Sequence, residues 1–193
     1  MLYRNTGSDT RSGILEAAAA VVAERGLDAA TTREICDRAG VSAPTLYHHF
    51  GDKQGLMDAV VTLAYERYLT RKRALRPTGN AREDLRRGWD AHVAFARANP
   101  VLYQLMWPAG STELPEAART SAALLRERFE ELESAGALRS GTTPGQATRA
   151  LSAALRGVTA AITRDPTNRD NVRLSETVRD AIVDALLVAE PAD

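Results

Sequence analysis

The chain has 193 residues, 25 basic and 25 acidic side chains, and only 5% aromatic residues. Abundant Leu, Ala, Arg and Glu favour an all-helical fold, and the balanced charge gives no support to nucleic-acid binding. A single cysteine excludes an internal disulfide, and because no apolar run approaches the roughly 20 residues that span a bilayer, we expect a cytoplasmic protein.

A first helix is predicted from about Thr10 to Arg25. Ile14, Ala18 and Val22 recur at helical spacing, and Gly26 ends the helix. The spacing gives this helix one apolar face, which belongs in a core.

A second, short helix is predicted from Thr31. Thr31 and Glu34 form a capping-box pattern, in which the Thr31 hydroxyl accepts from the Glu34 amide and the Glu34 carboxylate reaches back to the Thr31 amide. Ile35 and Ala39 form the inner face. Gly40 stands where a left-handed residue ends a helix.

A third helix is predicted after the turn residue Val41. Ser42 is placed to cap it, and Pro44 lies in its first turn, where the missing N–H costs nothing. Leu46 and Phe50 are four residues apart and point inward.

A fourth, longer helix follows a break at Gly51 and Asp52 and continues to about Arg73. Its apolar stripe consists of Leu56, Val60, Leu63 and Ala64. The segment from Pro77 to Gly79 is the best candidate for a break beyond it. Further helices are predicted at about 82–98, 101–106, 115–134, 146–163 and 174–189, which gives about nine helices in all.

Two short helices joined by a tight glycine-containing turn, with longer helices before and after, are typical of a helix-turn-helix. In this motif a small core holds the second short helix against the major groove of DNA, where base edges can be read. Residues 1–53 carry six basic and seven acidic side chains. The DNA-binding prediction therefore depends on the placement of individual residues and not on bulk charge.

The same segment resembles the TetR family of regulators. The matching stretches are TTREI at 31–35, AGVS at 39–42, PTLYHHF at 44–50 and DK at 52–53. The close match covers about residues 10–60, and the rest resembles the family in the number and layout of its helices. The resemblance implies a three-helix DNA-binding domain over residues 1–52, joined through the long fourth helix to a helical ligand-binding and dimerisation domain over residues 53–193.

The resemblance also implies a ligand-responsive transcriptional regulator. We expect a repressor that binds a near-palindromic DNA operator as a homodimer, with its recognition helices about 34–36 Å apart, and that a small molecule releases. An activator, or a regulator that answers to a protein, fits the same residues. No cofactor is expected.

The residues expected to contact DNA lie on or beside the two short helices. They are Thr32, Arg33, Ser42, Ala43, Pro44, Thr45, Tyr47, His48, His49 and Lys53. The Thr45 hydroxyl can bond a phosphate or a base edge, and Lys53 lies near the N-terminus of the fourth helix, whose dipole favours a phosphate. Two alternatives stay open: Tyr47 could be half-buried packing, and His49 could be an intramolecular partner.

The last two long helices carry apolar stripes that can pair with a second copy. The residues expected at the dimer interface are Leu151, Leu155, Val158, Ile162, Val178, Ile182 and Leu186. In the family that the chain resembles, these two helices of each subunit form a four-helix interface. The alternative is that both stripes belong to an ordinary core.

Aromatic residues concentrate between residues 89 and 107, which suits a small-molecule cavity. The residues expected to line it are Trp89, His92, Phe95, Tyr103, Met106, Trp107 and Arg156. An apolar or aromatic effector is expected, with Arg156 as a weaker candidate for an anionic group. The alternative is that these side chains only build the core.

An enzyme is the rival from a different class of protein, with His92 or the pair His48 and His49 as a base. The sequence has no Ser/His/Asp motif, no metal-ligand spacing and no glycine-rich phosphate loop. Adjacent helical residues point about 100° apart, so the histidine pair does not predict a metal site. We predict neither catalysis nor a bound metal.

Overall fold

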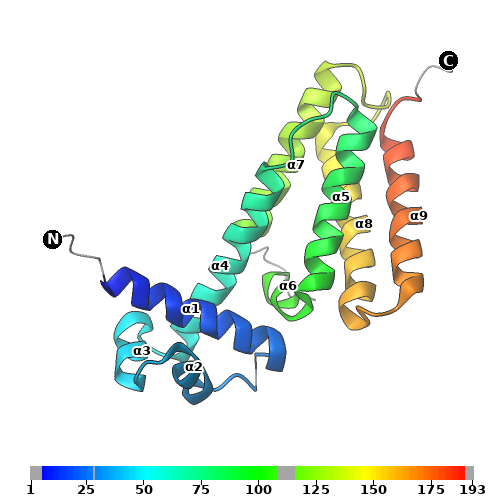
Figure 1. Ribbon diagram of the computed structural model, residues 1–193. Helices are drawn as coiled ribbons and strands as arrows, with labels where there is room; N and C mark the ends of the chain where they lie inside the picture. Colours follow the sequence, from blue (N-terminus) through cyan, green and yellow to red (C-terminus); the bar gives the residue numbers. More distant parts are fainter. Residues whose placement is uncertain (1–5, 28, 108–115, 190–193) are drawn as a thin grey trace. The chain divides into compact units, whose positions relative to one another are not determined.

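The computed structural model describes residues 6–27, 29–107 and 116–189, and over these ranges it consists of nine α-helices without a β-strand (Figure 1). The helices are α1 (Thr6–Arg25), α2 (Thr32–Ala39), α3 (Ala43–Phe50), α4 (Lys53–Arg73), α5 (Ala81–Ala98), α6 (Pro100–Met106), α7 (Glu116–Ser134), α8 (Pro144–Arg164) and α9 (Arg169–Leu186). The predicted all-α fold is confirmed. None of these helices combines the length and the apolarity that a membrane span requires.

The chain divides into two compact units, Met1–Arg67 and Tyr68–Asp193. Helix α4 begins in the first unit, and its last residues belong to the second. The domain boundary predicted after residue 52 falls at the start of this helix and stays a prediction.

The first unit has a small apolar core to which α1, α2, α3 and α4 all contribute. Ile14, Ile35, Leu46 and Leu56, one from each helix, are completely buried. Helix α1 begins at Thr6 and not at the predicted Thr10, which places Asp9 in its first turn, where the helix dipole favours a carboxylate.

Helix α2 is capped at both ends much as its sequence predicts. The Thr31 hydroxyl accepts from the Glu34 amide at 3.2 Å, and Gly40 ends the helix with a φ of 67°, a left-handed conformation that favours glycine. The second half of the predicted capping box is wrong. The Glu34 carboxylate instead lies 3.3 Å from the Arg25 guanidinium, which holds α2 against α1.

In the second unit, α5, α8 and α9 lie side by side and α7 packs against α8 (Figure 1). Trp89, Phe129 and Ile162 are buried between them. The Trp89 indole N–H donates to the Ser175 hydroxyl at 2.9 Å, which ties α5 to α9 and satisfies a polar atom in the core.

The last two helices begin earlier than predicted because of their caps. At α8, Thr143 and Gln146 form a complete capping box, which lets the helix start at Pro144. At α9, the Asn168 side chain accepts from the Asp170 amide at 2.9 Å. The helix therefore starts at Arg169, five residues before the predicted start at about 174.

Candidate functional sites

Helix α3 presents an exposed face above the core of the first unit. Leu46 is completely buried, whereas Tyr47 on the same helix is 42% exposed. Ser42, Ala43, Pro44 and His48 are also exposed. Because the inward side chain is locked in the core, the outward side chains are held in a fixed arrangement, which suits readout of a groove.

The N-terminal turn of α3 is closed by two hydroxyl groups. The Ser42 hydroxyl accepts from the Thr45 amide at 3.4 Å, and the two side-chain oxygens lie 2.9 Å apart. Thr45 is only partly exposed. Its hydroxyl is therefore held by Ser42, and its contact with DNA stays a prediction.

His49 lies against aromatic neighbours of the same helix. The centroid of the His49 ring is 5.4 Å from that of His48 and 6.3 Å from that of Phe50. The Arg11 guanidinium lies 4.9 Å from the centroid of the Phe50 ring. The intramolecular alternative for His49 thus stays open. No group of three potential metal ligands occurs in the described part of the chain.

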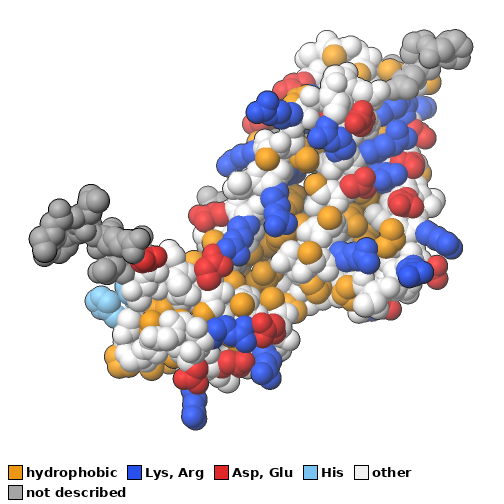
Figure 2. Space-filling model, in the orientation of Figure 1, with side chains coloured by type: hydrophobic (Ala, Val, Ile, Leu, Met, Phe, Trp, Pro, Cys, Tyr) orange, Lys and Arg blue, Asp and Glu red, His pale blue; other side chains and the backbone are white. Residues whose placement is uncertain are grey.

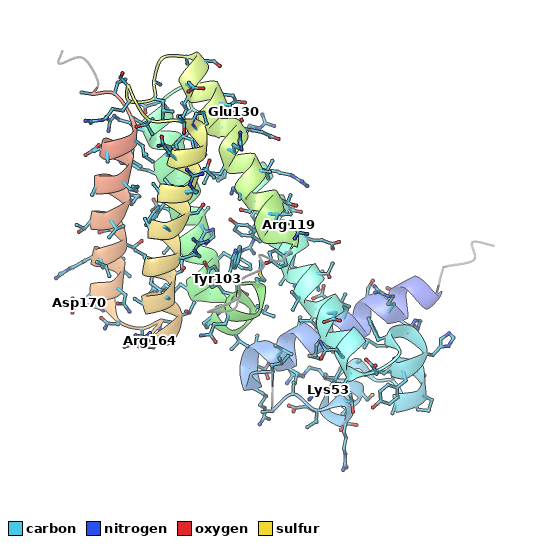
Figure 3. All side chains as sticks on the ribbon, turned by 180° about the vertical axis from the view of Figure 1, so that it is seen from behind. Lys53, Tyr103, Arg119, Glu130, Arg164 and Asp170 are labelled. Atoms are coloured by element: carbon cyan, nitrogen blue, oxygen red, sulfur yellow. The ribbon has the colours of Figure 1, made fainter. Side chains whose placement is uncertain are left out.

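Lys53 is exposed at the first residue of α4 (Figure 3). Asp52 precedes it and accepts from the Gly55 amide at 2.8 Å. A Cβ atom at Gly55 would meet the Phe50 carbonyl oxygen well inside van der Waals contact. The close approach of the end of α3 to the start of α4 therefore requires glycine at this position.

Helix α2 offers Arg33, which is exposed, and Thr32, which is partly buried. Behind them, the Arg38 guanidinium forms a two-bond ion pair with the Glu24 carboxylate at 2.6 and 2.8 Å. This hydrogen bonding with Arg38 holds the pKa of the Glu24 carboxyl below its usual value. The pair fixes α2 relative to α1.

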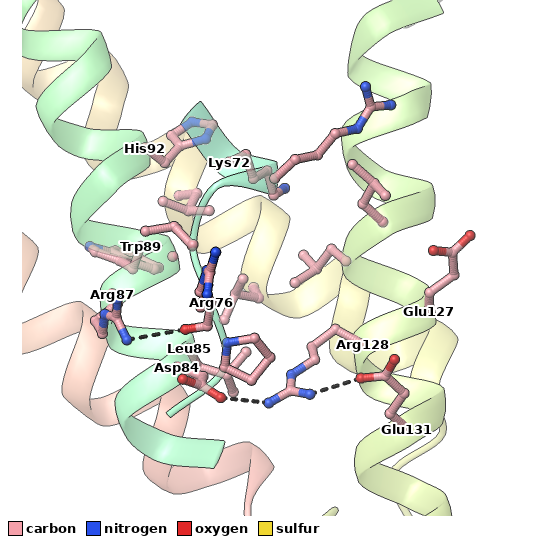
Figure 4. A pocket seen from close by; sticks show the side chains of 18 of the residues that line it. Lys72, Arg76, Asp84, Leu85, Arg87, Trp89, His92, Glu127, Arg128 and Glu131 are labelled. Carbon is pink, nitrogen blue, oxygen red and sulfur yellow. Dashed lines mark hydrogen bonds and ion pairs between the residues drawn. The ribbon is translucent and has the colours of Figure 1, made fainter. Parts of the chain in front are cut away.

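The second unit contains a cavity of about 280 Å³ lined by α4, α5, α7 and α8 (Figure 4). Its apolar walls include Leu85, Trp89, Leu125, Leu151 and Leu155. This volume lies near the lower end of the range for small-molecule sites, about 300–1,000 Å³.

The polar wall of this cavity carries an ion-pair network. The Arg128 guanidinium lies 2.7 Å from the Asp84 carboxylate and 2.8 Å from the Glu131 carboxylate, and Arg87 donates to the Arg76 carbonyl at 3.3 Å (Figure 4). Two of the acidic side chains in the cavity wall are therefore already paired.

A smaller cavity of about 60 Å³ adjoins the first. The two share Lys72, His92, Leu125 and Leu155 in their walls. The smaller one is completed by Tyr103, Trp107, Ser121, Ala122, Ser152 and Arg156.

An aromatic cluster lies at this junction. The Tyr103 and Trp107 rings stack with centroids 4.4 Å apart, and the Tyr68 ring meets those of His92, Trp107 and Phe95 at 5.4, 5.4 and 5.3 Å. These are the separations of favourable aromatic pairs. Side chains from α4, α5 and α6 thus form one packed group.

Hydrogen bonds across this cluster fix the tautomer of His92. The Thr159 hydroxyl donates to the Leu155 carbonyl at 2.7 Å, so at 2.9 Å it must accept from the Tyr103 hydroxyl. The Tyr103 oxygen then accepts from the Nε2–H of His92 at 2.9 Å. The Nδ1 atom of His92 is left as an acceptor.

The chain of hydrogen bonds continues from Nδ1 of His92 to α4. The Tyr68 hydroxyl donates to Nδ1 at 2.7 Å and accepts from the Ser121 hydroxyl at 3.3 Å. The Lys72 ammonium donates to the Ser121 hydroxyl at 2.9 Å and to the Ser121 carbonyl at 3.3 Å. Five helices are thereby linked through side-chain hydrogen bonds.

Three titratable groups in this series of hydrogen bonds, Tyr68, Lys72 and His92, have strongly shifted pKa values. Burial and the nearby charge of Lys72 lower the pKa of His92 to about 3, which keeps the ring neutral. Burial lowers the pKa of Lys72 to about 8 and raises that of Tyr68 to about 12. Shifts of this kind, beside a cavity, mark a candidate binding site.

Comparisons with known proteins decide the family. Residues 14–60 match the N-terminal family model of the bacterial regulatory proteins of the tetR family, and residues 85–187, more than half of the chain, match the tetracyclin repressor-like C-terminal domain. The chain belongs to the TetR family. The fold and the family are those of DNA-binding transcriptional regulators.

Curated relatives match over part of the chain. The HTH-type transcriptional repressor KstR2 of Mycobacterium tuberculosis is 49% identical over 51 residues, which is 26% of each chain. The HTH-type transcriptional activator FasR of Mycolicibacterium smegmatis is 36% identical over 111 residues, 57% of this chain and 51% of the relative. The chain therefore spans between about a quarter and a half of the length of these two relatives.

Solved structures match over nearly the whole chain. One of them comes from work described as the molecular basis for control of antibiotic production by bacterial hormones. It has a TM-score of 0.78 at 27% sequence identity, and the match covers 93% of this chain and 98% of the chain in that structure. A TetR-family transcriptional regulator from Pectobacterium atrosepticum has a TM-score of 0.76 at 22% identity, covering 98% and 100%. The second likeness concerns the fold alone.

Five of the seven predicted ligand residues of this TetR-family chain line the two cavities, and their role in ligand binding stays a prediction. Trp89 lines the larger cavity and His92 both, and Tyr103, Trp107 and Arg156 line the smaller one. The remaining two, Phe95 and Met106, are buried and line neither.

Sequence reasoning missed Tyr68, Lys72 and Ser121 as residues of the site. Lys72 stands in the run Arg71-Lys72-Arg73 at the end of α4, which resembles an exposed charged helix terminus. A signal was present, since steps of four from Ala64 reach Tyr68 and then Lys72, on the apolar stripe. That spacing places the lysine inward.

The predicted dimer residues lie in the core of the chain itself. Leu151, Leu155, Val158, Ile162 and Leu186 are buried there, and Val178 and Ile182 pack partly buried against the same cluster. A periodic stripe indicates a buried face but not whether the same chain or a partner covers it. The homodimer stays a prediction, and exposed positions of α8 and α9 are better placed to carry it.

Proposed function

We propose that this protein is a ligand-responsive repressor that acts in the cytoplasm. As a homodimer it binds a near-palindromic operator through α3, and a small molecule with an apolar or aromatic body releases it. The observation that supports this most directly is the span of α4. The helix begins at exposed Lys53, beside α3, and ends with Tyr68 and Lys72 in the wall of the cavity.

We infer that α4 is the element through which the effector acts. A ligand can release DNA only if it binds more tightly to a conformation that does not fit the operator. Tyr68 and Lys72 are held by hydrogen bonds to His92 and Ser121. A ligand that contacts these two side chains more favourably in one position of α4 than in another changes the position that α4 prefers in the second unit, and the same helix carries Lys53.

For DNA recognition we propose the ten residues predicted from the sequence. Tyr47 and His48 supply the exposed centre of α3, and Lys53 and Arg33 are exposed cations at the N-termini of α4 and α2. The helix N-termini favour phosphate oxygens. Phosphate contacts position the helix, while Tyr47 and its neighbours read the bases.

For dimerisation we propose the exposed faces of α8 and α9. On α9 the large apolar side chain of Leu174 is 45% exposed, and Val188, beyond its end, is 44% exposed. Small exposed residues accompany them, namely Ala153, Gly157 and Ala160 on α8 and Ala181 and Ala185 on α9. Small residues allow two helices to approach closely, and the large apolar ones then lose their exposed surface.

A selection from random double-stranded DNA with the purified protein tests the proposal. We expect enrichment of a near-palindrome with half-sites one helical turn or a multiple apart. A reporter gene under that operator should be repressed by the protein. Activation would support the second candidate, which the activator name of one relative favours. Failure to enrich any sequence would contradict the DNA-binding role.

A further inference from the structure

We propose that the effector of this protein is a carboxylate with an apolar body, and that Lys72 is the residue that selects it. This inference rests on the proposed function, because it names the ligand class of the same cavity. It goes beyond that function by assigning the charge of the ligand and the residue that recognises it.

Lys72 is a cation without an anionic partner in the described part of the chain. Its ammonium donates only to the hydroxyl and the carbonyl of Ser121, and the Tyr68 ring lies 5.9 Å from it. The ion pairs of the structure involve arginines and not this lysine. Lys72 is partly buried, and an unpaired charge that is partly removed from water costs free energy unless a counter-charge is supplied.

The surroundings of Lys72 favour an anion over a cation. The smaller cavity adds Arg156 and has no acidic residue among the lining side chains that the structure describes. In the larger cavity, Asp84 and Glu131 are already paired with Arg128. The remaining acidic residue there, Glu127, forms no ion pair with Lys72 and projects away from it in Figure 4.

The hydrogen-bond chain leaves the ammonium as the available donor. The hydroxyl protons of Ser121, Tyr68 and Tyr103 are all directed along the chain, toward Tyr68, His92 and Thr159 respectively. An ammonium has three N–H groups and two of them are bonded to Ser121. A carboxylate can therefore accept from Lys72 without breaking the chain, whereas a ligand cation would meet like charge.

The apolar wall fixes the rest of the ligand. Leu85, Trp89, Leu125, Leu151 and Leu155 enclose the cavity of about 280 Å³ next to Lys72. This volume lies near the lower end of the range for small-molecule sites, which favours a small ligand. Octanoate and arylacetates are of this size, and they unite one carboxylate with an apolar body.

The test compares matched charged and neutral probes on the full-length protein. The panel consists of saturated carboxylates from butyrate to dodecanoate, phenylacetate and 1-naphthylacetate, each with its primary alcohol. Binding is followed by the fluorescence of Trp89 and Trp107, the two tryptophans of the chain, which line the two cavities. Wild type should bind at least one carboxylate about 10- to 100-fold more tightly than its alcohol, as a charge-assisted hydrogen bond implies.

Lys72→Met should remove this preference and leave alcohol binding within about threefold. Arg71→Met is the matched control, because Arg71 is the preceding residue of α4, carries the same charge and is exposed. It should keep the full preference. If Lys72→Met does not fold, Lys72→Gln replaces it, since the amide still donates to Ser121 and only the charge is lost.

Three results would overturn the proposal. They are equal affinity of wild type for each carboxylate and its alcohol, an unchanged preference in the Lys72 variant, and no binding of any carboxylate in the panel. Operator binding is measured on the same preparations. A protein that binds its operator but shows one of these results keeps the proposed function and loses the carboxylate, whereas loss of operator binding in wild type contradicts the function itself.

Discussion

The two units of the chain carry their candidate functional residues in opposite ways. In the first unit Tyr47, His48 and Lys53 are exposed, and the core beneath them is built from apolar side chains such as Ile35 and Leu46. In the second unit the candidate residues are largely removed from solvent and joined by hydrogen bonds. An exposed residue of the first unit can be changed without affecting its neighbours, whereas a change to one hydrogen-bonded residue of the second unit also affects the residues bonded to it.

This difference separates binding from stability. Loss of an exposed side chain removes a contact with the partner and leaves the fold nearly unchanged. Loss of a neutral side chain from the hydrogen-bond chain leaves its neighbours without partners, which lowers stability. Loss of a titratable side chain also changes how stability depends on pH. Substitutions of exposed residues in the first unit should therefore weaken operator binding and leave unfolding nearly unchanged. Substitutions in the hydrogen-bond chain of the second unit should change the stability measured by unfolding.

The largest effect is expected for the double variant Tyr47→Ala, Lys53→Ala. At roughly 1 kcal/mol for each contact, four lost contacts in a homodimer weaken operator binding about 1000-fold. The midpoint of thermal unfolding should be unchanged, because both side chains are exposed. Gel-shift titration and thermal denaturation measure the two quantities. Arg126→Ala, an exposed cation on α7, is the control, and operator binding that survives the double change would show that the recognition helix is misassigned.

The second prediction concerns the pH dependence that His92 gives to stability. Its pKa is about 3 in the folded chain, against 6.5 for a free histidine, so the unfolded chain binds the proton more tightly. Stability should therefore fall as the pH drops below about 6.5, by about 1–2 kcal/mol between pH 7 and pH 5. His92→Gln should be less stable at pH 7 and lose less on acidification.

Urea unfolding at both pH values measures this effect. His48→Gln changes an exposed histidine of the first unit and should match wild type at each pH. An equal loss of stability on acidification in wild type and His92→Gln would mean that His92 does not stay neutral in the folded protein.

The same contrast explains what could be predicted from the sequence. In the first unit the signals are local: Thr31 and Gly40 cap α2 and lie within a few residues of the helix they end. The exposed face of α3 follows from the inward Leu46. Such features depend on short stretches of the chain, so periodicity and capping residues were sufficient to predict them.

In the second unit the decisive features depend on distant parts of the chain. Ser121 is far from Tyr68 and Lys72 in sequence, and the contacts between them arise only when α7 packs beside the end of α4. Likewise, Leu151 and Leu186 belong to stripes whose spacing is the same for a core and for an interface. The spacing predicts a buried face, and only the packing shows that the chain itself covers it.

The third prediction tests the junction between α3 and α4. Gly55→Ala brings a Cβ atom against the Phe50 carbonyl, so the helices must move apart, at a cost of about 1–3 kcal/mol. Because α3 shifts as well, operator affinity should also fall. Gly13→Ala is the matched control, since its Cβ meets no atom and alanine favours the helix, which stabilises by about 0.5–1 kcal/mol. Equal stability of the two variants in urea unfolding would contradict this role of Gly55.

The last prediction concerns the stability of Lys72→Met. The pKa of Lys72 is about 8 in the folded chain against 10.5 in the unfolded one. The unfolded chain therefore binds the proton more tightly between these two values, and wild-type stability should rise with pH across this window.

Below pH 8 the charged Lys72 side chain lowers the stability of the wild type, and its bonds to Ser121 offset part of this cost. Lys72→Met should therefore be about 1–2 kcal/mol more stable than wild type at pH 7, with a gap that closes toward pH 10.5. Urea unfolding at pH 7 and pH 10 measures the gap, and Arg71→Met should show none. A Lys72→Met variant that is less stable than wild type at pH 7 would mean that the ammonium already has its counter-charge in the ligand-free protein, and with it the physical reason for a carboxylate effector would be lost.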